Sequence, residues 1–216
     1  MTRLGIIPAL ASPALIGLSY VFYLYTTGVV TDVNWTYGVL AILIAILCSA
    51  FYRRCSKTAL GGLLIFLVYG MMIALGLVYV MTGRLIWSTL LVVAPAGLLD
   101  VAMLLASNTR DMQQDKAAGR RTQAIRLGLE GAQVTYQTLL LAAYLLVAVA
   151  VMLHLLSPLS FVVLLSFPLV LQNIRRMKSA TPDDPGSILS LDVQTALLVV
   201  LFSLLLAAAN FISPFI

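Results

Sequence analysis

Long apolar stretches alternate with short polar connections along the whole chain. A helix needs about 20 consecutive apolar residues to cross a bilayer, and seven stretches approach or exceed that length: 5–27, 34–52, 59–81, 85–107, 133–154, 157–174 and 190–213. None of them shows the alternation of apolar and polar residues that a membrane β-barrel strand requires. We therefore predict an all-α fold, a polytopic transmembrane helical bundle of about seven spans, as a single domain over residues 1–216.

The amino-acid composition is typical of a protein that lies in a bilayer, and the positions of the charged residues indicate its orientation. The chain is 62% hydrophobic and 10% charged, against about 25% charged for soluble domains. Of its 13 Lys and Arg residues, all but Arg84 lie on one set of connections between the spans. The positive-inside rule assigns that set to the cytoplasm. We expect a multi-pass protein of the cytoplasmic (inner) membrane with a cytoplasmic N-terminus. The net charge of +5 reflects this topology and is no nucleic-acid footprint, because the basic loops lack interleaved aromatic residues.

The longest polar stretch, "NTRDMQQDKAAGRRTQAIRLG" at 108–128, follows the fourth apolar stretch without a break. We expect one continuous helix across this junction, ending near Gly119. Steps of three and four residues would place five side chains on one face of it: Asp100, Leu104, Asn108, Asp111 and Asp115. Lys116 and Arg120 would form a second pair, one turn apart, beside the carboxylates.

Two carboxylates at this spacing suit Mg²⁺. This ion takes oxygen ligands and is commonly held by one or two carboxylates together with the phosphates of a substrate. Arginine and lysine nearby would bind the remaining phosphate oxygens. The spacing therefore fits a diphosphate held by a metal at the membrane surface. The spacing alone does not establish such a site, because it is also typical of a solvated loop whose charges only set the topology.

The full pattern, N-T-R-D-x-x-x-D-x-x-x-G-R-R-T-x-A-x-R-L-G, resembles the second aspartate-rich motif of the UbiA superfamily of intramembrane prenyltransferases. Its ending, "GRRTQAIRLG", is most similar to the branch that prenylates 1,4-dihydroxy-2-naphthoate in menaquinone synthesis. The resemblance implies a prenyl diphosphate and an aromatic acceptor as partners. It implies that Asp111 and Asp115 are catalytic and bind Mg²⁺. It also implies a set of diphosphate-binding residues: Asn108, Arg110, Lys116, Arg120 and Arg121.

The sequence also departs from that superfamily. Its members resemble a nine-span bundle with an earlier NDxxDxxxD motif, which these 216 residues do not contain. Before Asp100 the only acid is Asp32, on the predicted outer side. Ser107 stands where the naphthoate branch has a second asparagine, and "YRRCSK" places Lys57 one residue too far from Tyr52 for a YxxxK motif. The chain looks as if it begins two spans late, so we expect a missing N-terminal segment as a further partner.

Two alternatives to a complete enzyme stay open. One is a catalytically incomplete remnant or one part of a split prenyltransferase. The other is a membrane transporter, which would carry charged residues through several spans, whereas Asp100 is nearly alone within the spans of this chain.

Asp100 is itself a functional candidate, because a carboxylate inside a span costs at least about 2.5 kcal/mol. It would line a cavity and meet the hydroxyl of the aromatic substrate, or it would pair with a polar neighbour such as Asn210 or Gln194. Asp192 opens the last span, where a helix-start role is expected.

Overall fold

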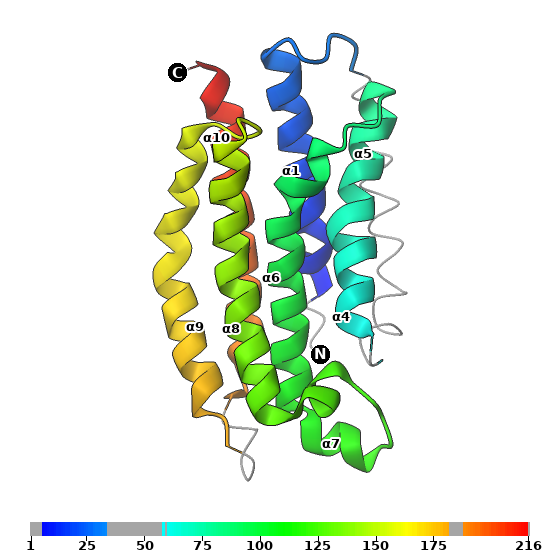
Figure 1. The fold of residues 1–216 in the computed structure, drawn as a ribbon, viewed down its shortest axis with the longest axis vertical. Helices are drawn as coiled ribbons and strands as arrows, with labels where there is room; N and C mark the ends of the chain where they lie inside the picture. Colours follow the sequence, from blue (N-terminus) through cyan, green and yellow to red (C-terminus); the bar gives the residue numbers. More distant parts are fainter. Residues whose placement is uncertain (1–5, 34–57, 59, 182–187, 216) are drawn as a thin grey trace.

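Figure 1 shows the computed structural model, which describes residues 6–33, 58, 60–181 and 188–215. Every regular element within those ranges is a helix, and the long helices run side by side as a bundle (Figure 1). The elements are α1 (Ile6–Thr26), α4 (Gly61–Leu64), η2 (Ile65–Met72), α5 (Ile73–Thr82), α6 (Ser88–Arg110), α7 (Met112–Ala117), α8 (Gln123–Met152), η3 (Pro158–Ser166), α9 (Phe167–Ser179), α10 (Leu191–Ile212) and η5 (Ser213–Phe215).

The predicted spans can be compared with these elements one by one. The stretch 34–52 lies outside the described residues; each of the other six corresponds to a helix or to consecutive helices. In the described part, five helical segments are long and apolar enough to cross a membrane: 61–82, 88–110, 123–152, 158–179 and 191–215. The prediction of an all-α membrane bundle is confirmed.

Helix α6 is the centre of the bundle and contacts α8, α10, α1 and η2. Of the most apolar part of α6, 83% is buried inside the protein, against 28–56% for the other four candidate spans. Lipid tails are as apolar as leucine, so helices in a bilayer associate through close packing, which small residues permit. Helix α6 supplies such residues along its length: Ala94, Ala96, Gly97, Ala102 and Ala106.

The closest of these packing contacts joins Gly97 to Gly70. Gly70 lies in η2, a π-helical segment that continues α4 into α5. A Cβ atom placed on Gly97 would lie 3.0 Å from the Gly70 Cα, and one placed on Gly70 would lie 2.8 Å from the Gly97 Cα. Glycine at both positions therefore lets the two backbones approach each other directly.

The expected continuous helix through the aspartates is wrong, because α6 ends at Arg110 and a separate short helix, α7, follows. Asp111 between them has φ −86° and ψ 6°, outside the helical range of ψ. The Asp111 N–H still bonds the Ser107 carbonyl at 3.0 Å, and the Asp115 N–H bonds the Asp111 carbonyl at 2.8 Å. The break therefore bends the chain to one side at the end of the bundle (Figure 1), while Asp111 and Asp115 stay one turn apart.

The predicted helix end near Gly119 is confirmed. Gly119 has φ +68°, a conformation that glycine adopts without strain. Its N–H bonds the Lys116 carbonyl at 3.0 Å, and the Arg120 N–H bonds the Asp115 carbonyl at 2.9 Å. These two bonds form a Schellman motif, which satisfies the last carbonyls of α7 and reverses the chain direction.

Helix α8 begins ten residues before the stretch predicted for it. The Thr122 side chain accepts the Ile125 N–H at 3.4 Å and caps its start. Gly128 then interrupts the helical geometry with φ 69° and ψ 175°. Most of α8 runs along the bundle beside α6, whereas its first turns lie at the end of the bundle near α7 (Figure 1).

The span predicted at 157–174, with two prolines, is a 3₁₀ helix, η3, followed by α9. Pro158 is the first residue of η3, and the Ser157 side chain accepts the Leu159 N–H at 3.2 Å. Pro168 lies in the first turn of α9. Both prolines occupy helix starts, where their missing N–H costs no hydrogen bond.

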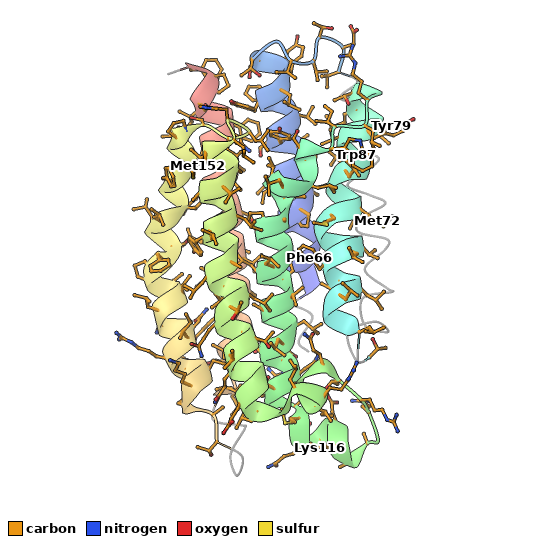
Figure 2. All side chains as sticks on the ribbon, viewed as in Figure 1. Phe66, Met72, Tyr79, Trp87, Lys116 and Met152 are labelled. Atoms are coloured by element: carbon orange, nitrogen blue, oxygen red, sulfur yellow. The ribbon has the colours of Figure 1, made fainter. Side chains whose placement is uncertain are left out.

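Figure 2 places Tyr79 and Trp87 at one end of the bundle and Lys116 at the other. We predict that Arg84, close to Trp87 in sequence, faces the outside and Lys116 the cytoplasm. Single cysteines at these two positions, in a Cys48→Ser/Cys55→Ser background, should differ in labelling by a membrane-impermeant maleimide. In intact cells only the cysteine at position 84 should react, and both should react after permeabilisation. If only the cysteine at position 116 reacts in intact cells, the orientation in the membrane is the opposite of the predicted one.

Candidate functional site

The carboxylates that the sequence singled out lie at the end of α6 and on α7. Asp111 lies at the bend between the two helices, and its side chain is 19% exposed. Asp115 follows one turn later and is 1% exposed. Because a buried carboxylate is stable only with hydrogen-bond or cationic partners, the charges around these two residues define the chemistry of the site.

Arg110 connects this region to the start of α10. Its Nε donates a hydrogen bond to Asp111 Oδ1 at 2.8 Å, and its Nη1 donates to Asp192 Oδ2 at 2.6 Å. The same Nη1 lies 3.4 Å from the Leu189 carbonyl oxygen. One planar guanidinium therefore bridges two carboxylates from different helices, an arrangement that the several fixed donors of arginine permit.

Asp192 is the residue whose role sequence reasoning underestimated. It lies in the first turn of α10, as expected for a helix start, and its Oδ1 accepts the Val193 N–H at 3.0 Å. Its side chain is only 7% exposed, because it also pairs with Arg110. The two residues are 82 positions apart, so no local pattern could have indicated the pair. The sequence did contain one indication of the pair: Asp192 is an acid at the end of the bundle where the basic loops were predicted to lie.

Arg120 pairs with the second motif aspartate. Its Nη1 donates to Asp115 Oδ1 at 2.8 Å, and the arginine side chain remains 53% exposed. The expected Lys116–Arg120 pair on one helix face is wrong, because α7 ends at Ala117 and the Schellman motif turns Arg120 back towards Asp115. Lys116 and Arg121 are exposed. We call Asp111, Asp115, Asp192, Arg110 and Arg120 the carboxylate–arginine cluster.

Two further candidates lie deeper in α6. Asn108 is fully buried, one turn before the cluster. Asp100 is also fully buried and accepts a hydrogen bond from Ser12 Oγ of α1, 3.2 Å from Oδ2. The helical rise places it about 16.5 Å along the helix axis from Asp111, so it is no member of the cluster. The suggested pairing with Asn210 or Gln194 is not what the structure shows; Asn210 Nδ2 donates to Ser19 Oγ at 3.0 Å.

A sequence model of the UbiA prenyltransferase family matches residues 8–196, which include all of these candidate residues. The chain belongs to the UbiA prenyltransferase family.

Individual relatives match shorter segments. The UbiA prenyltransferase domain-containing protein 1 homolog of Drosophila melanogaster is 38% identical over 86 residues, 40% of this chain and 24% of the relative. The 1,4-dihydroxy-2-naphthoate octaprenyltransferase of Bacillus subtilis is 33% identical over 97 residues, 45% of this chain and 31% of the relative. The Escherichia coli protein of the same name is 28% identical over 162 residues, 74% of this chain and 53% of the relative. The matches thus span about a quarter to a half of these relatives.

The donor chemistry of the cluster can be tested against the Mg²⁺ that the UbiA resemblance implies. Asp111 and Asp115 offer carboxylate oxygens one turn apart, which suits a hard cation. Within the described ranges, no three His, Cys, Asp or Glu side chains form a metal site by themselves. Each of the two carboxylates instead accepts a hydrogen bond from an arginine. These residues fit an ion that shares its ligands with a substrate, and they fit poorly an ion held by protein alone.

We predict that Asp192→Asn destabilises the protein by about 1–3 kcal/mol, since it removes one of the two carboxylates that pair with the largely buried guanidinium of Arg110. Unfolding of the full chain in mixed micelles by a denaturing detergent measures this. The matched control is Asp32→Asn, which alters an exposed acid in the connection after α1. A double-mutant cycle with Arg110→Gln should show coupling between the two residues; strictly additive effects would contradict the ion pair.

Proposed function

We propose that this UbiA-family chain takes part in the transfer of a polyprenyl group from a prenyl diphosphate to an aromatic quinone precursor. The observation that carries the proposal is the carboxylate–arginine cluster, at one end of the helical bundle of a UbiA-family chain. The bacterial relatives are 1,4-dihydroxy-2-naphthoate octaprenyltransferases, so a dihydroxynaphthoate is the acceptor we propose, within menaquinone biosynthesis. The charge pattern of the loops supports a site that faces the cytoplasm from the inner membrane.

Asp111 and Asp115 are the proposed Mg²⁺ ligands. When bound, the metal would neutralise negative charge on the diphosphate as it leaves the prenyl carbon. Arg110 and Arg120 already hold these carboxylates at 2.8 Å, so binding requires that each arginine exchange a carboxylate oxygen for a phosphate oxygen. Charge is balanced in that exchange only when metal and diphosphate arrive together. Asp192 would keep Arg110 in place during the exchange through its own bond at 2.6 Å.

The other residues have supporting roles in this proposal. Asn108 and Arg121 would contribute hydrogen-bond donors to the diphosphate, as the resemblance implies. The bundle would keep water away from the allylic cation that forms when the diphosphate departs. Asp100, buried beside Ser12, lies along the same helix at a depth where it would meet a group inside the bundle. The apolar faces of the spans would accommodate the isoprenoid chain.

We predict that Mg²⁺ binds tightly to the purified chain only in the presence of a non-hydrolysable prenyl diphosphate analogue. Two carboxylates hold this ion weakly, and here they are already paired with arginines. Calorimetric titration with and without the analogue measures the difference. The double variant Asp111→Asn/Asp115→Asn should abolish the Mg²⁺ binding that depends on the analogue, and Asp32→Asn should leave it unchanged. If the double variant binds Mg²⁺ as tightly as the native chain, Asp111 and Asp115 are not the metal ligands.

We also predict that residues 1–216 alone have little or no prenyltransferase activity. The resemblance implies two aspartate-rich motifs around the diphosphate, and these residues contain one. Each lost electrostatic contact to a developing charge costs about 10²–10³ in rate. Co-expression with a two-span segment that carries an NDxxDxxxD motif should restore the incorporation of labelled prenyl diphosphate into dihydroxynaphthoate by membranes. Robust turnover by the 216-residue chain that is lost in Asp111→Ala would show that one motif suffices for catalysis. It would also exclude the alternative of an incomplete remnant or one part of a split prenyltransferase.

A further inference from the structure

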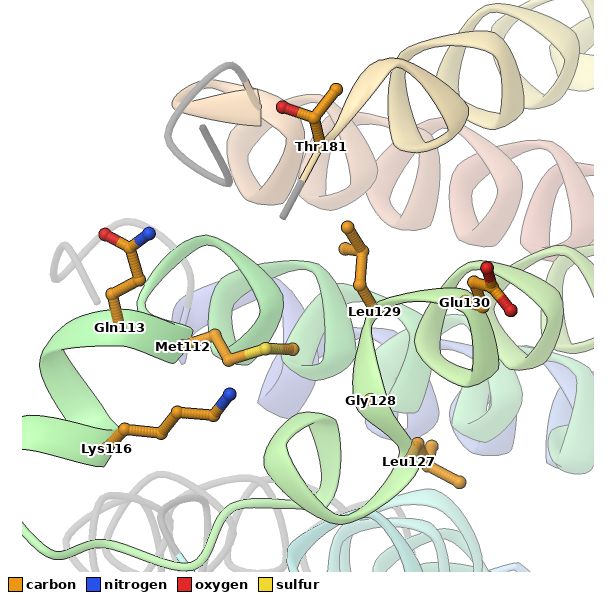
Figure 3. Close-up of a pocket in the computed structure, with 8 residues that line it drawn as sticks. All are labelled: Met112, Gln113, Lys116, Leu127, Gly128, Leu129, Glu130 and Thr181. Atoms are coloured by element: carbon orange, nitrogen blue, oxygen red, sulfur yellow. The ribbon is translucent and has the colours of Figure 1, made fainter. Parts of the chain in front are cut away.

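A pocket of about 410 Å³ lies between α7, the kink at Gly128 and the end of α9 (Figure 3). We call it the α7–α8 pocket. Its volume lies within the range of about 300–1,000 Å³ that small-molecule sites occupy. On α7 it is lined by Met112 and Lys116, each of which follows a motif aspartate by one residue. Both side chains therefore project about 100° around the helix from the aspartates, on a face that the proposed prenyl transfer leaves unused.

The length of α8 indicates that this pocket lies at the level of the lipid headgroups. Helix α8 has 30 residues, whereas about 20 suffice to cross the hydrocarbon of a bilayer. Its long apolar stretch begins at residue 133, so roughly the first ten residues of the helix lie outside the hydrocarbon, at the end near α7. Among them are Glu130, which is exposed, and Leu127, which is 41% exposed. Exposed charged and apolar side chains next to each other suit the boundary between headgroups and acyl chains.

The pocket has one charge of each sign and an apolar wall. Lys116 lies on one side of it and Glu130 on the other (Figure 3). Neither forms an ion pair with any residue that the structure describes. Met112, Leu127 and Leu129 supply the apolar wall. A ligand that matches this lining has an anionic group, a cationic group and apolar atoms attached to them.

Charge and hydrogen bonding select one headgroup among the common phospholipids. A lipid phosphate accepts hydrogen bonds from the Lys116 amine, and the primary ammonium of ethanolamine donates to the Glu130 carboxylate. The quaternary ammonium of choline has no N–H and is recognised by aromatic faces, and none of the described residues that line the pocket is aromatic. An anionic headgroup such as phosphatidylglycerol has no cation to offer Glu130 and would be repelled by it.

We propose that the α7–α8 pocket binds the headgroup of phosphatidylethanolamine, with the phosphate at Lys116 and the ammonium at Glu130. The acyl chains remain in the bilayer. The inference is independent of the proposed function, and it moves Lys116 from the diphosphate, where the sequence pattern placed it, to a lipid. The bound headgroup holds α7, the helix that carries Asp115, against the kinked start of α8.

Native mass spectrometry of the full chain in detergent micelles, titrated with one lipid at a time, tests the proposal. The lipids are dioleoyl phosphatidylethanolamine, phosphatidylcholine and phosphatidylglycerol, which differ only in the headgroup. The native chain should bind the ethanolamine lipid most tightly. Lys116→Gln should weaken that binding by about fivefold, as expected for one lysine at a lipid phosphate. Lys178→Gln, an exposed lysine on α9 outside the pocket, is the matched control and should leave it unchanged.

Glu130→Gln tests the ammonium separately. This variant should bind the ethanolamine lipid no better than the choline lipid, and it should bind phosphatidylglycerol more tightly than the native chain does, because the repulsion is removed. Asp111→Asn/Asp115→Asn should leave the binding of all three lipids unchanged, so a failure of the proposed Mg²⁺ site is distinguishable from a failure of this inference.

Three results would overturn the proposal. The first is equal binding of the three lipids by the native chain, or an ethanolamine preference that survives in Glu130→Gln. The second is tightest binding of phosphatidylglycerol by the native chain, which would assign the pocket to an anionic lipid. The third is displacement of the ethanolamine lipid by pyrophosphate in the native chain but not in Lys116→Gln, which would assign Lys116 to the diphosphate.

Discussion

A bilayer offers no hydrogen-bond partners to the peptide backbone, and the rest of this structure depends on that constraint. Every backbone group inside the hydrocarbon must be satisfied within a helix, so the apolar stretches become helices whatever their packing. Packing then requires one helix to be surrounded by others. Helix α6 occupies that position, with its small residues against four neighbouring elements and Gly97 against Gly70. The central helix is therefore the most buried of the candidate spans in the described residues, and the candidate site lies at its end.

The same constraint explains why the polar chemistry gathers at one end of the bundle. Where α6 reaches the membrane surface, the chain can bend at Asp111, end α7 at Gly119 and bend again at Gly128. Three carboxylates and two arginines meet there in ion pairs of 2.6–2.8 Å. Such pairs tolerate burial because each charge has a partner. In the proposed function, the carboxylates would exchange these arginine partners for a metal that arrives with a negatively charged substrate.

Arg110 is the residue through which the motif is coupled to the rest of the bundle. It shares its donors between the bend at Asp111 and the first turn of α10. A movement of α10 would therefore shift Arg110 and with it the motif. If Asp111 released Arg110, the bond to Asp192 would still hold the guanidinium in place. On α7, Lys116 lies near Met112 (Figure 3) and forms no ion pair with any residue that the structure describes. Neighbouring basic residues in one motif thus have different physical surroundings.

The sequence by itself determined the fold class, five of the predicted spans, the helix end near Gly119 and the family, because each depends on local apolar length, glycine geometry or a motif in fixed register. It could not determine that Asp111 sits at a bend, that Arg120 turns back to Asp115, or that Asp100 meets Ser12. The bend and the return of Arg120 are local, since Arg120 and Asp115 are five positions apart. The other partners depend on contacts between segments far apart in the chain: Asp192 meets Arg110 across 82 positions, and Asp100 meets Ser12 across 88. Periodicity reports which face a residue occupies on its own helix. Only the packing of whole helices, driven by close contact of small residues around α6, decides which other helix that face meets.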